Sequence, residues 1–147
     1  MVLLESSVLM LGGKIFSTLI NDTASKIISV TETAIIHNHT DVHDIFTELD
    51  LDVRLEVINS LINHIKDENE TIHICLKSIL DVITEINKIT NKIKLAQEEH
   101  REKYFNEWRA INVDEHILGL KKQSELLDKR FNLLVNIVRF EDSNITE

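Results

Sequence analysis

Proline is absent from this 147-residue chain, and glycine occurs only three times, as Gly12, Gly13 and Gly119. Strand-rich folds need many tight turns, and those turns usually carry glycine or proline, so a sheet is not expected. Apolar residues make up 43% of the sequence, which is enough for a folded core. We therefore predict an all-α protein in which residues 1–147 form a single helical domain, a bundle of about four long helices.

Positive charge is also scarce, because 16 Lys and Arg stand against 25 Asp and Glu and give a net charge of −9. Nucleic-acid binding depends on Lys and Arg against phosphate, so we predict no nucleic-acid partner and disfavour an anionic membrane surface. The lone cysteine, Cys75, cannot form an internal disulfide, which fits a reducing, cytoplasmic compartment. No uncharged apolar run reaches roughly 18 residues, so no spanning helix is expected. Glu5 stands where a signal peptide would carry positive charge, so no cleaved signal is expected.

Apolar periodicity divides the chain into four helical segments, with a further helix start expected at Asp52 after the stretch ELDLD. Four Asn-x-Thr triplets begin at Asn21, Asn38, Asn69 and Asn144, and we interpret them as helix boundaries rather than glycosylation acceptors. The first segment holds only five charged residues in positions 1–36, so it is predicted to be central in the bundle or to face a partner or a membrane surface. The predicted segments are residues 1–37, 41–66, 70–110 and 114–140.

The last two segments carry heptad seams. One seam has isoleucines spaced by seven, each followed three residues later by a second small or apolar residue, and the other alternates at three and four. The members are Ile72, Cys75, Ile79, Val82, Ile86, Ile89, Ile93 and Ala96, and then Ile117, Leu120, Ser124, Leu127, Phe131, Leu134 and Val138.

A connection of a few residues near 111–113 predicts that these segments form an antiparallel, coiled-coil-like hairpin. A tight turn there would pair Ile93 with Phe131, Ile86 with Val138, Gln97 with Leu127, and His100 with Ser124. The last pair would form a polar layer that fixes the register of the hairpin.

The stretch EEHREKYFNEWR, residues 98–109, contains the single Tyr and the single Trp of the chain. Tyr104 and Trp108 share a helix face, so one interpretation is that they close the hairpin core and the charges form a solvated face. The other is a partner-binding surface, because Trp, Tyr and Arg are favoured anchors. The partner-binding candidates are Phe105, Trp108 and Arg109 here, with Leu3, Leu4 and Leu11 in the apolar first segment.

Catalytic and metal patterns are weak. The cluster HNHTDVHD offers His37, His39 and His43, but it lacks the second pair of ligands that a structural zinc site uses, so solvated helix-junction residues are the simpler interpretation. Glu70 and His73 match one Glu-x-x-His element where a di-iron bundle needs two. Gly12-Gly13 lacks the Lys-Ser/Thr ending of a phosphate loop, and Cys75 is predicted to be a buried thiol. We therefore predict no enzyme, no cofactor and no metal.

The segment YFNEWR, followed by LLDKRFNLLVNIV, resembles small helical proteins of unassigned role from large DNA viruses with AT-rich genomes, over residues 70–140. The composition agrees, since 21 Ile and 12 Asn against four Ala are typical of an AT-rich genome, although such a protist or bacterium would fit equally. The resemblance implies viral origin and no mechanism.

Together these features predict a non-enzymatic interaction or assembly protein that binds a protein partner or itself, with a homo-oligomer expected. A viral form would be a virion component or a host-protein-binding bundle, placed in the host cytoplasm or the virion. Two alternatives remain: a metal- or cofactor-binding bundle, and association with a membrane surface through residues 2–20.

Overall fold

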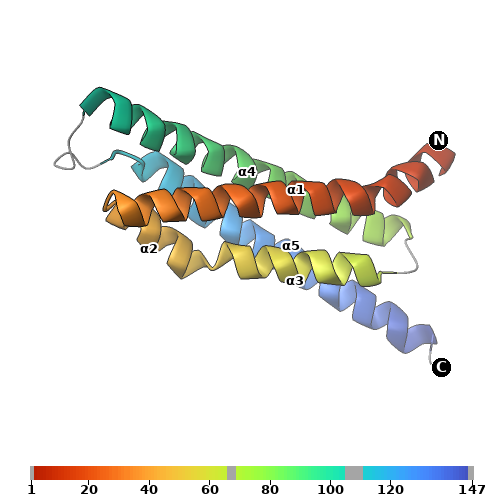
Figure 1. Ribbon diagram of the computed structural model, residues 1–147. Helices are drawn as coiled ribbons and strands as arrows, with labels where there is room; N and C mark the ends of the chain where they lie inside the picture. Colours follow the sequence, from red (N-terminus) through yellow and green to blue (C-terminus); the bar gives the residue numbers. More distant parts are fainter. Residues whose placement is uncertain (1, 66–68, 105–110, 146–147) are drawn as a thin grey trace.

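The computed structural model describes the backbone of residues 2–65, 69–104 and 111–145, and the side chains of residues 15–65, 69–102 and 111–141. Within these residues the chain forms five α-helices joined by short connections and contains no strand (Figure 1). The all-α prediction is therefore confirmed. The helices are α1 (Val2–Ile36), α2 (Thr40–Leu49), α3 (Leu51–His64), α4 (Glu70–Tyr104) and α5 (Asp114–Ile145).

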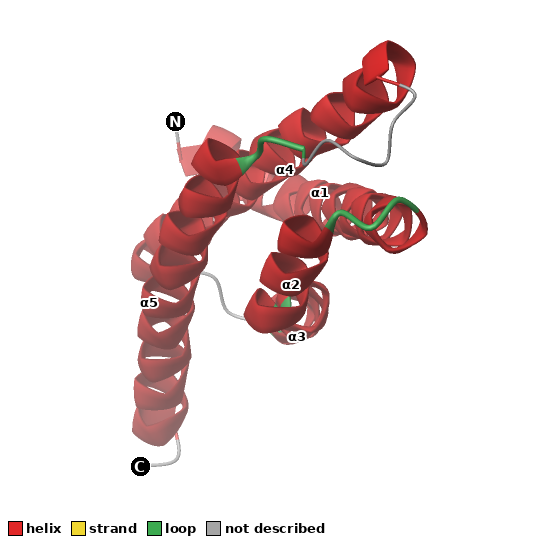
Figure 2. Cartoon of the chain, turned by 90° about the vertical axis from the view of Figure 1, so that its left-hand side faces the viewer, coloured by secondary structure: helices red, strands yellow, loops and turns green. Residues whose placement is uncertain are grey.

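The helices form a bundle in which α2 and α3 together take the place of one long helix. α1 and α4 run in one direction, and α2, α3 and α5 run in the other (Figure 1). α1 packs against α2, α3 and α4, while α5 packs against α4 and also touches α2. Figure 2 shows α1 between α4 and the α2–α3 pair.

Helix boundaries follow local backbone chemistry. Asn38, between α1 and α2, has a positive φ of 56°, a conformation that asparagine tolerates better than most residues. Asn69 caps α4, because its Oδ1 accepts a hydrogen bond from the Ile72 N–H at 2.9 Å. The triplets at Asn38 and Asn69 are thus boundaries, as predicted, but Asn21 lies inside α1, where the prediction is wrong.

The second predicted segment, 41–66, is two helices and not one. Asp50 adopts φ 49° and ψ 42°, a left-handed conformation that ends α2, and α3 begins at Leu51, one residue before the start expected at Asp52. The N-cap of α2 is His39, and its side chain makes no capping hydrogen bond.

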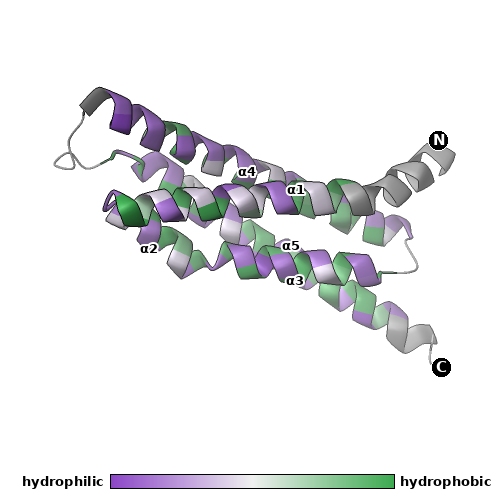
Figure 3. Cartoon of the chain, viewed as in Figure 1, coloured by the Kyte–Doolittle hydropathy of each residue, from purple (hydrophilic) through white to green (hydrophobic). Residues whose placement is uncertain are grey.

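Both heptad seams lie in the core. Cys75 and the isoleucines spaced by seven in α4 are buried, and α5 buries Leu120, Ser124, Leu127 and Leu134. α1 contributes a third buried row at helical spacing, and apolar and polar residues alternate along each helix in Figure 3. This row consists of Phe16, Ile20, Thr23, Ile27, Val30 and Ala34. Within the described residues, no helix is long and apolar enough to cross a membrane.

The predicted register of the α4–α5 hairpin is wrong. Arg130 Nη1 donates to the Ser78 carbonyl at 2.6 Å, and a Cβ added to Gly119 would lie 3.1 Å from Ile89 Cδ1. These contacts place Ser124 at the level of Thr84 and not of His100, a difference of about 24 Å along α4. The other three predicted pairs, Ile93–Phe131, Ile86–Val138 and Gln97–Leu127, fail for the same reason.

The physical reason is that the hairpin does not close with a tight turn near residues 111–113. Ile111 and Val113 are buried, so the three residues directly before α5 pack on the bundle and do not form that turn. The end of α4 therefore extends past the start of α5, as Figure 1 shows.

Polar contacts between other helices replace the predicted layer. Arg54 of α3 donates to Ser124 Oγ of α5 at 2.6 Å and to the Leu49 carbonyl at 2.9 Å, and it also pairs with Asp128. Between α1 and α4, buried Gln97 donates to the Val30 carbonyl at 3.0 Å. Arg54 and Gln97 reach these partners only at one helix register, so these contacts select the observed packing.

A double-mutant cycle tests this register. We expect Arg54→Met and Ser124→Ala to be coupled by about 0.5–3 kcal/mol in the free energy of unfolding, because they share a direct hydrogen bond. Urea denaturation of the two single variants and the double variant measures the coupling. His100→Asn combined with Ser124→Ala is the control and should be additive within about 0.5 kcal/mol. Coupling of His100 with Ser124 instead would restore the register predicted from the heptads.

Candidate partner-binding site

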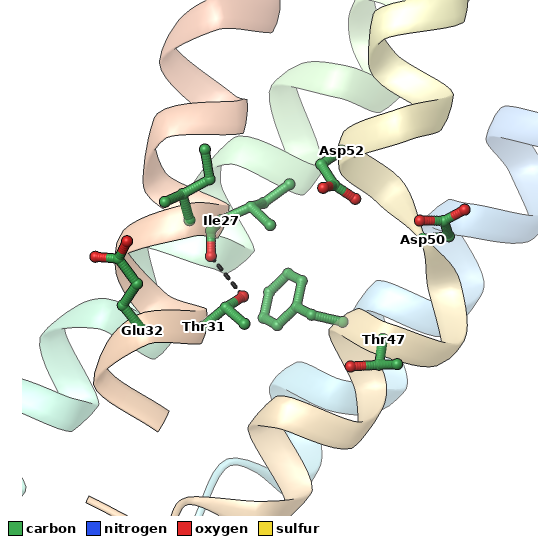
Figure 4. A pocket seen from close by; sticks show the side chains of 8 residues that line it. Ile27, Thr31, Glu32, Thr47, Asp50 and Asp52 are labelled. Atoms are coloured by element: carbon green, nitrogen blue, oxygen red, sulfur yellow. Dashed lines mark hydrogen bonds between the residues drawn. The ribbon is translucent and has the colours of Figure 1, made fainter. Parts of the chain in front are cut away.

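A groove lies between α1 and the junction of α2 with α3, with a volume of about 340 Å³. We call it the α1–α2 groove (Figure 4). One wall comes from α1 and the other from α2, the break at Asp50 and the first turn of α3. Its lining residues are Ile27, Ile28, Thr31, Glu32, Phe46, Thr47, Asp50 and Asp52.

The lining follows from helical spacing on both sides. The α1 residues lie at positions i, i+1, i+4 and i+5, which share one face of a helix. Across the groove, the Asp50 N–H donates to the Phe46 carbonyl at 3.1 Å, so the left-handed residue ends α2 one turn after Phe46. Ile27 and Phe46 are each only 4% exposed, which gives the groove an apolar base.

The two threonines in the lining use their hydroxyls within their own helices. Thr31 Oγ1 donates to the Ile27 carbonyl at 2.7 Å, drawn as the dashed line in Figure 4, and Thr47 Oγ1 donates to the His43 carbonyl at 2.9 Å. Because threonine is small, the two positions leave space between the walls that a larger residue would fill. The groove is therefore a product of side-chain size as well as of the helix break.

Exposed apolar side chains continue the groove along α1. Ile28 is 52% exposed, and Ile35, one heptad later on the same face, is 60% exposed. Ile36 at the end of the helix is 69% exposed. Single exposed apolar residues are ordinary, but a row beside a groove with an apolar base is typical of a binding surface.

Three carboxylates rim the groove: Glu32 on α1, and Asp50 and Asp52 on the opposite wall (Figure 4). The two cations nearest in sequence have partners elsewhere. Lys26 donates to Asp22 and to Asn87 Oδ1 of α4, and Arg54 is held by Ser124 and Asp128 of α5. The charge of the rim is therefore not neutralised by its own neighbours.

The partner-binding candidates from the sequence are not brought into this groove. Phe105, Trp108 and Arg109 lie outside the described residues, and the same holds for the side chain of Tyr104. Leu3, Leu4 and Leu11 lie on the first turns of α1, but their side chains are also outside the described part. Those predictions therefore stay predictions.

The groove residues were missed by sequence reasoning. Their signal is faint: isoleucines at positions 28 and 35 on the outward face of α1, and an acidic ELDLD stretch that breaks a helix without glycine or proline. Neither the break angle nor the gap between two threonines can be derived from periodicity.

Of the three weak metal candidates, His37, His39 and His43, only His39 is buried, so it is not the solvated junction residue that the sequence suggested. His39 is 5% exposed, its Nδ1 lies 3.4 Å from Gln97 Nε2, and its ring packs edge-on to His100 with centroids 5.6 Å apart. The ring of His37 is 6.0 Å from that of His39, while His43 lies beside Asp44. In the part of the chain that the structure describes, no three potential ligands are placed to hold a metal ion.

The cluster that forms thus includes His100 of α4 in place of His43. Burial lowers the pKa of His39, and the neighbouring His100 and His37 lower it further, because a second positive charge would be repelled there. His39 at the start of α2 is therefore held in its neutral form in the fold.

No family model matches this chain, and no solved structure matches it. The chain is similar to Uncharacterized protein L717 of Acanthamoeba polyphaga mimivirus, with 30% identity over 73 residues. The match covers 50% of this chain and 35% of the mimivirus protein, so this chain corresponds to about a third of that protein's length. The expected resemblance to proteins of large DNA viruses is supported to this extent, and the relative's name assigns it no role.

The pKa of His39 predicts how stability depends on pH. A histidine whose pKa is lowered by folding binds protons more readily in the unfolded chain. Its contribution to the free energy of unfolding is therefore complete above the unfolded pKa of about 6.5 and is lost as the pH falls below that value. We expect the free energy of unfolding to decrease from pH 7.5 to pH 5.5, and His39→Asn to reduce that decrease. Denaturant titrations at several pH values measure this decrease. His64→Asn, at an exposed histidine of α3, is the control. An unchanged slope in His39→Asn would contradict the assignment.

Proposed function

We propose that this chain is a non-enzymatic protein-binding or assembly protein, and that a segment of its partner occupies the α1–α2 groove. The observation that carries the proposal is a groove with an apolar base, continued by exposed isoleucines on α1. Its volume of about 340 Å³ lies at the lower end of the range for small-molecule sites and is suited to one or two large side chains. Anchor side chains that enter such pockets account for much of the affinity in protein interfaces.

The chemistry of the lining supports binding rather than catalysis. Neither hydroxyl is activated, because Thr31 and Thr47 donate to carbonyls of their own helices. The described lining includes no histidine or cysteine that could act as base or nucleophile. Elsewhere, Cys75 is buried and burial raises the pKa of its thiol, so the reactive thiolate is disfavoured.

The mimivirus relative supports a viral setting for this proposal. In that setting the chain serves as a virion component or as a binder of a host protein, in the host cytoplasm or in the virion. Self-association is the other form of the same proposal, since a second copy could present a helix to the exposed isoleucines of α1.

Site-specific photocrosslinking tests the groove as the contact surface. A photoreactive phenylalanine analogue in place of Ile28 should crosslink to a defined partner in the native host cell, and the same analogue in place of exposed Leu118 on α5 should not. Thr47→Trp should fill the groove and abolish the adduct. Ser60→Trp, an equally large change on the exposed face of α3, should leave it intact.

Circular dichroism of each variant shows whether the fold is retained, so that loss of the adduct reports on the groove. An Ile28 adduct that survives Thr47→Trp would refute the groove as the binding site. So would an absence of any adduct at Ile28 in a folded chain.

A further inference from the structure

We infer that the partner segment is basic and amphipathic, with an apolar anchor side chain flanked by Lys or Arg. The inference rests on the proposed function, because it names the partner chemistry of the same α1–α2 groove. It follows from the distribution of charge around the groove and from the position of the carboxylates on its two walls.

Charge is segregated along this part of the chain. Residues 27–53 include six acidic residues and no Lys or Arg. They comprise the end of α1, all of α2 and the start of α3, which are the elements that build the groove. A net charge of −9 is therefore not spread evenly, and the groove lies in an acidic region that attracts cations.

The carboxylates stand on both sides of the apolar base. Glu32 projects from α1, while Asp50 and Asp52 lie on the opposite wall, beyond Thr31 and Ile27 in the view of Figure 4. A segment lying across the groove would place one apolar side chain on Ile27 and Phe46. Residues on either side of that anchor would then meet a carboxylate on each wall, so the groove favours a positive–apolar–positive pattern.

These carboxylates are available to a partner. All three residues are exposed, and among the described residues none of their side chains makes a hydrogen bond or an ion pair. The nearby cations already have partners outside the groove: Lys26 contacts Asp22 and Asn87, and Arg54 contacts Ser124 and Asp128. A partner's Lys or Arg would thus meet carboxylates that have no competing internal partner.

The fold itself favours a negative charge at Asp52, whereas it does not require one at Glu32 or Asp50. Asp52 lies in the first turn of α3, where the helix dipole favours a negative charge. Asp50 lies in the left-handed region, where Asn would serve as well, and Glu32 lies in the last turns of α1. Glu32 and Asp50 are therefore the positions at which charge can be removed with the least effect on the fold.

An unbiased peptide selection tests the inference. A phage library of random 12-residue peptides is selected on the full chain and counter-selected on the folded Thr47→Trp variant, which removes binders that do not use the groove. We expect the enriched peptides to carry an aromatic or large aliphatic residue flanked by Lys or Arg. Enrichment of neutral or acidic peptides would overturn the inference.

Fluorescence anisotropy of the best-enriched peptide measures how much the groove carboxylates contribute to its affinity. We expect Glu32→Gln with Asp50→Asn to raise its Kd about tenfold, and 300 mM salt to reduce the difference, since exposed pairs are weak singly and screened by salt. Asp81→Asn with Glu98→Gln removes the same charge from the exposed face of α4 and is the matched control. Equal effects of the two double variants would show only attraction to an acidic chain and would overturn the inference.

Failure of the inference and failure of the proposed function give different results. If the Ile28 adduct depends on Thr47 but the selected peptides are not basic, the groove remains a binding site with a different partner. If the selection yields no peptide that Thr47→Trp excludes, while the adduct persists in that variant, both fail. A dimer seen by sedimentation that Thr47→Trp dissociates would mean that a second copy fills the groove, and it would overturn the inference.

Discussion

The left-handed residue Asp50 is the constraint on which the arrangement of the other elements depends. Its N–H donates to the Phe46 carbonyl and ends α2, and its own carbonyl accepts from the Arg54 N–H, which starts α3. One residue thus closes one helix and opens the next, so the chain bends without a loop. Asp is among the few non-glycine residues that adopt this conformation at a modest energetic cost.

The same break positions Arg54, which connects three elements. Its guanidinium donates back to the Leu49 carbonyl, left unpaired by the end of α2, and reaches across to Ser124 and Asp128 of α5. A helix end with an unsatisfied carbonyl is unfavourable, so the arginine stabilises the break and the α3–α5 packing together. These contacts also hold the positive charge of Arg54 away from the groove, which therefore stays acidic.

Sequence reasoning succeeded where periodicity determines the outcome and failed where turn geometry does. The seams in α4 and α5 are buried as predicted, because a heptad repeat has one apolar face whatever it packs against. The pairing of His100 with Ser124 failed because apolar heptad seams can pack against each other at more than one register. Those registers are distinguished by specific contacts, such as that of Arg130 with the Ser78 carbonyl, and by the burial of Ile111 and Val113 before α5. The groove could not be predicted, since it depends on the left-handed conformation of Asp50 and on which side chains of α1 face that break.

The short helix α2 links the histidine cluster with the groove. Isolated helices of fewer than about 12 residues are marginal in water, so α2, with 10 residues, depends on tertiary contacts for its position. Those contacts come from its buried apolar face, Val42, Ile45 and Phe46, and from buried His39 at its start, which lies against Gln97 and His100. Protonation of His39 disfavours the packing at the first end, because it places a charge in a site that burial keeps neutral. The wall that carries Phe46 and Thr47 is thus held in place by the buried apolar face of α2 and by the packing of neutral His39 at its first end.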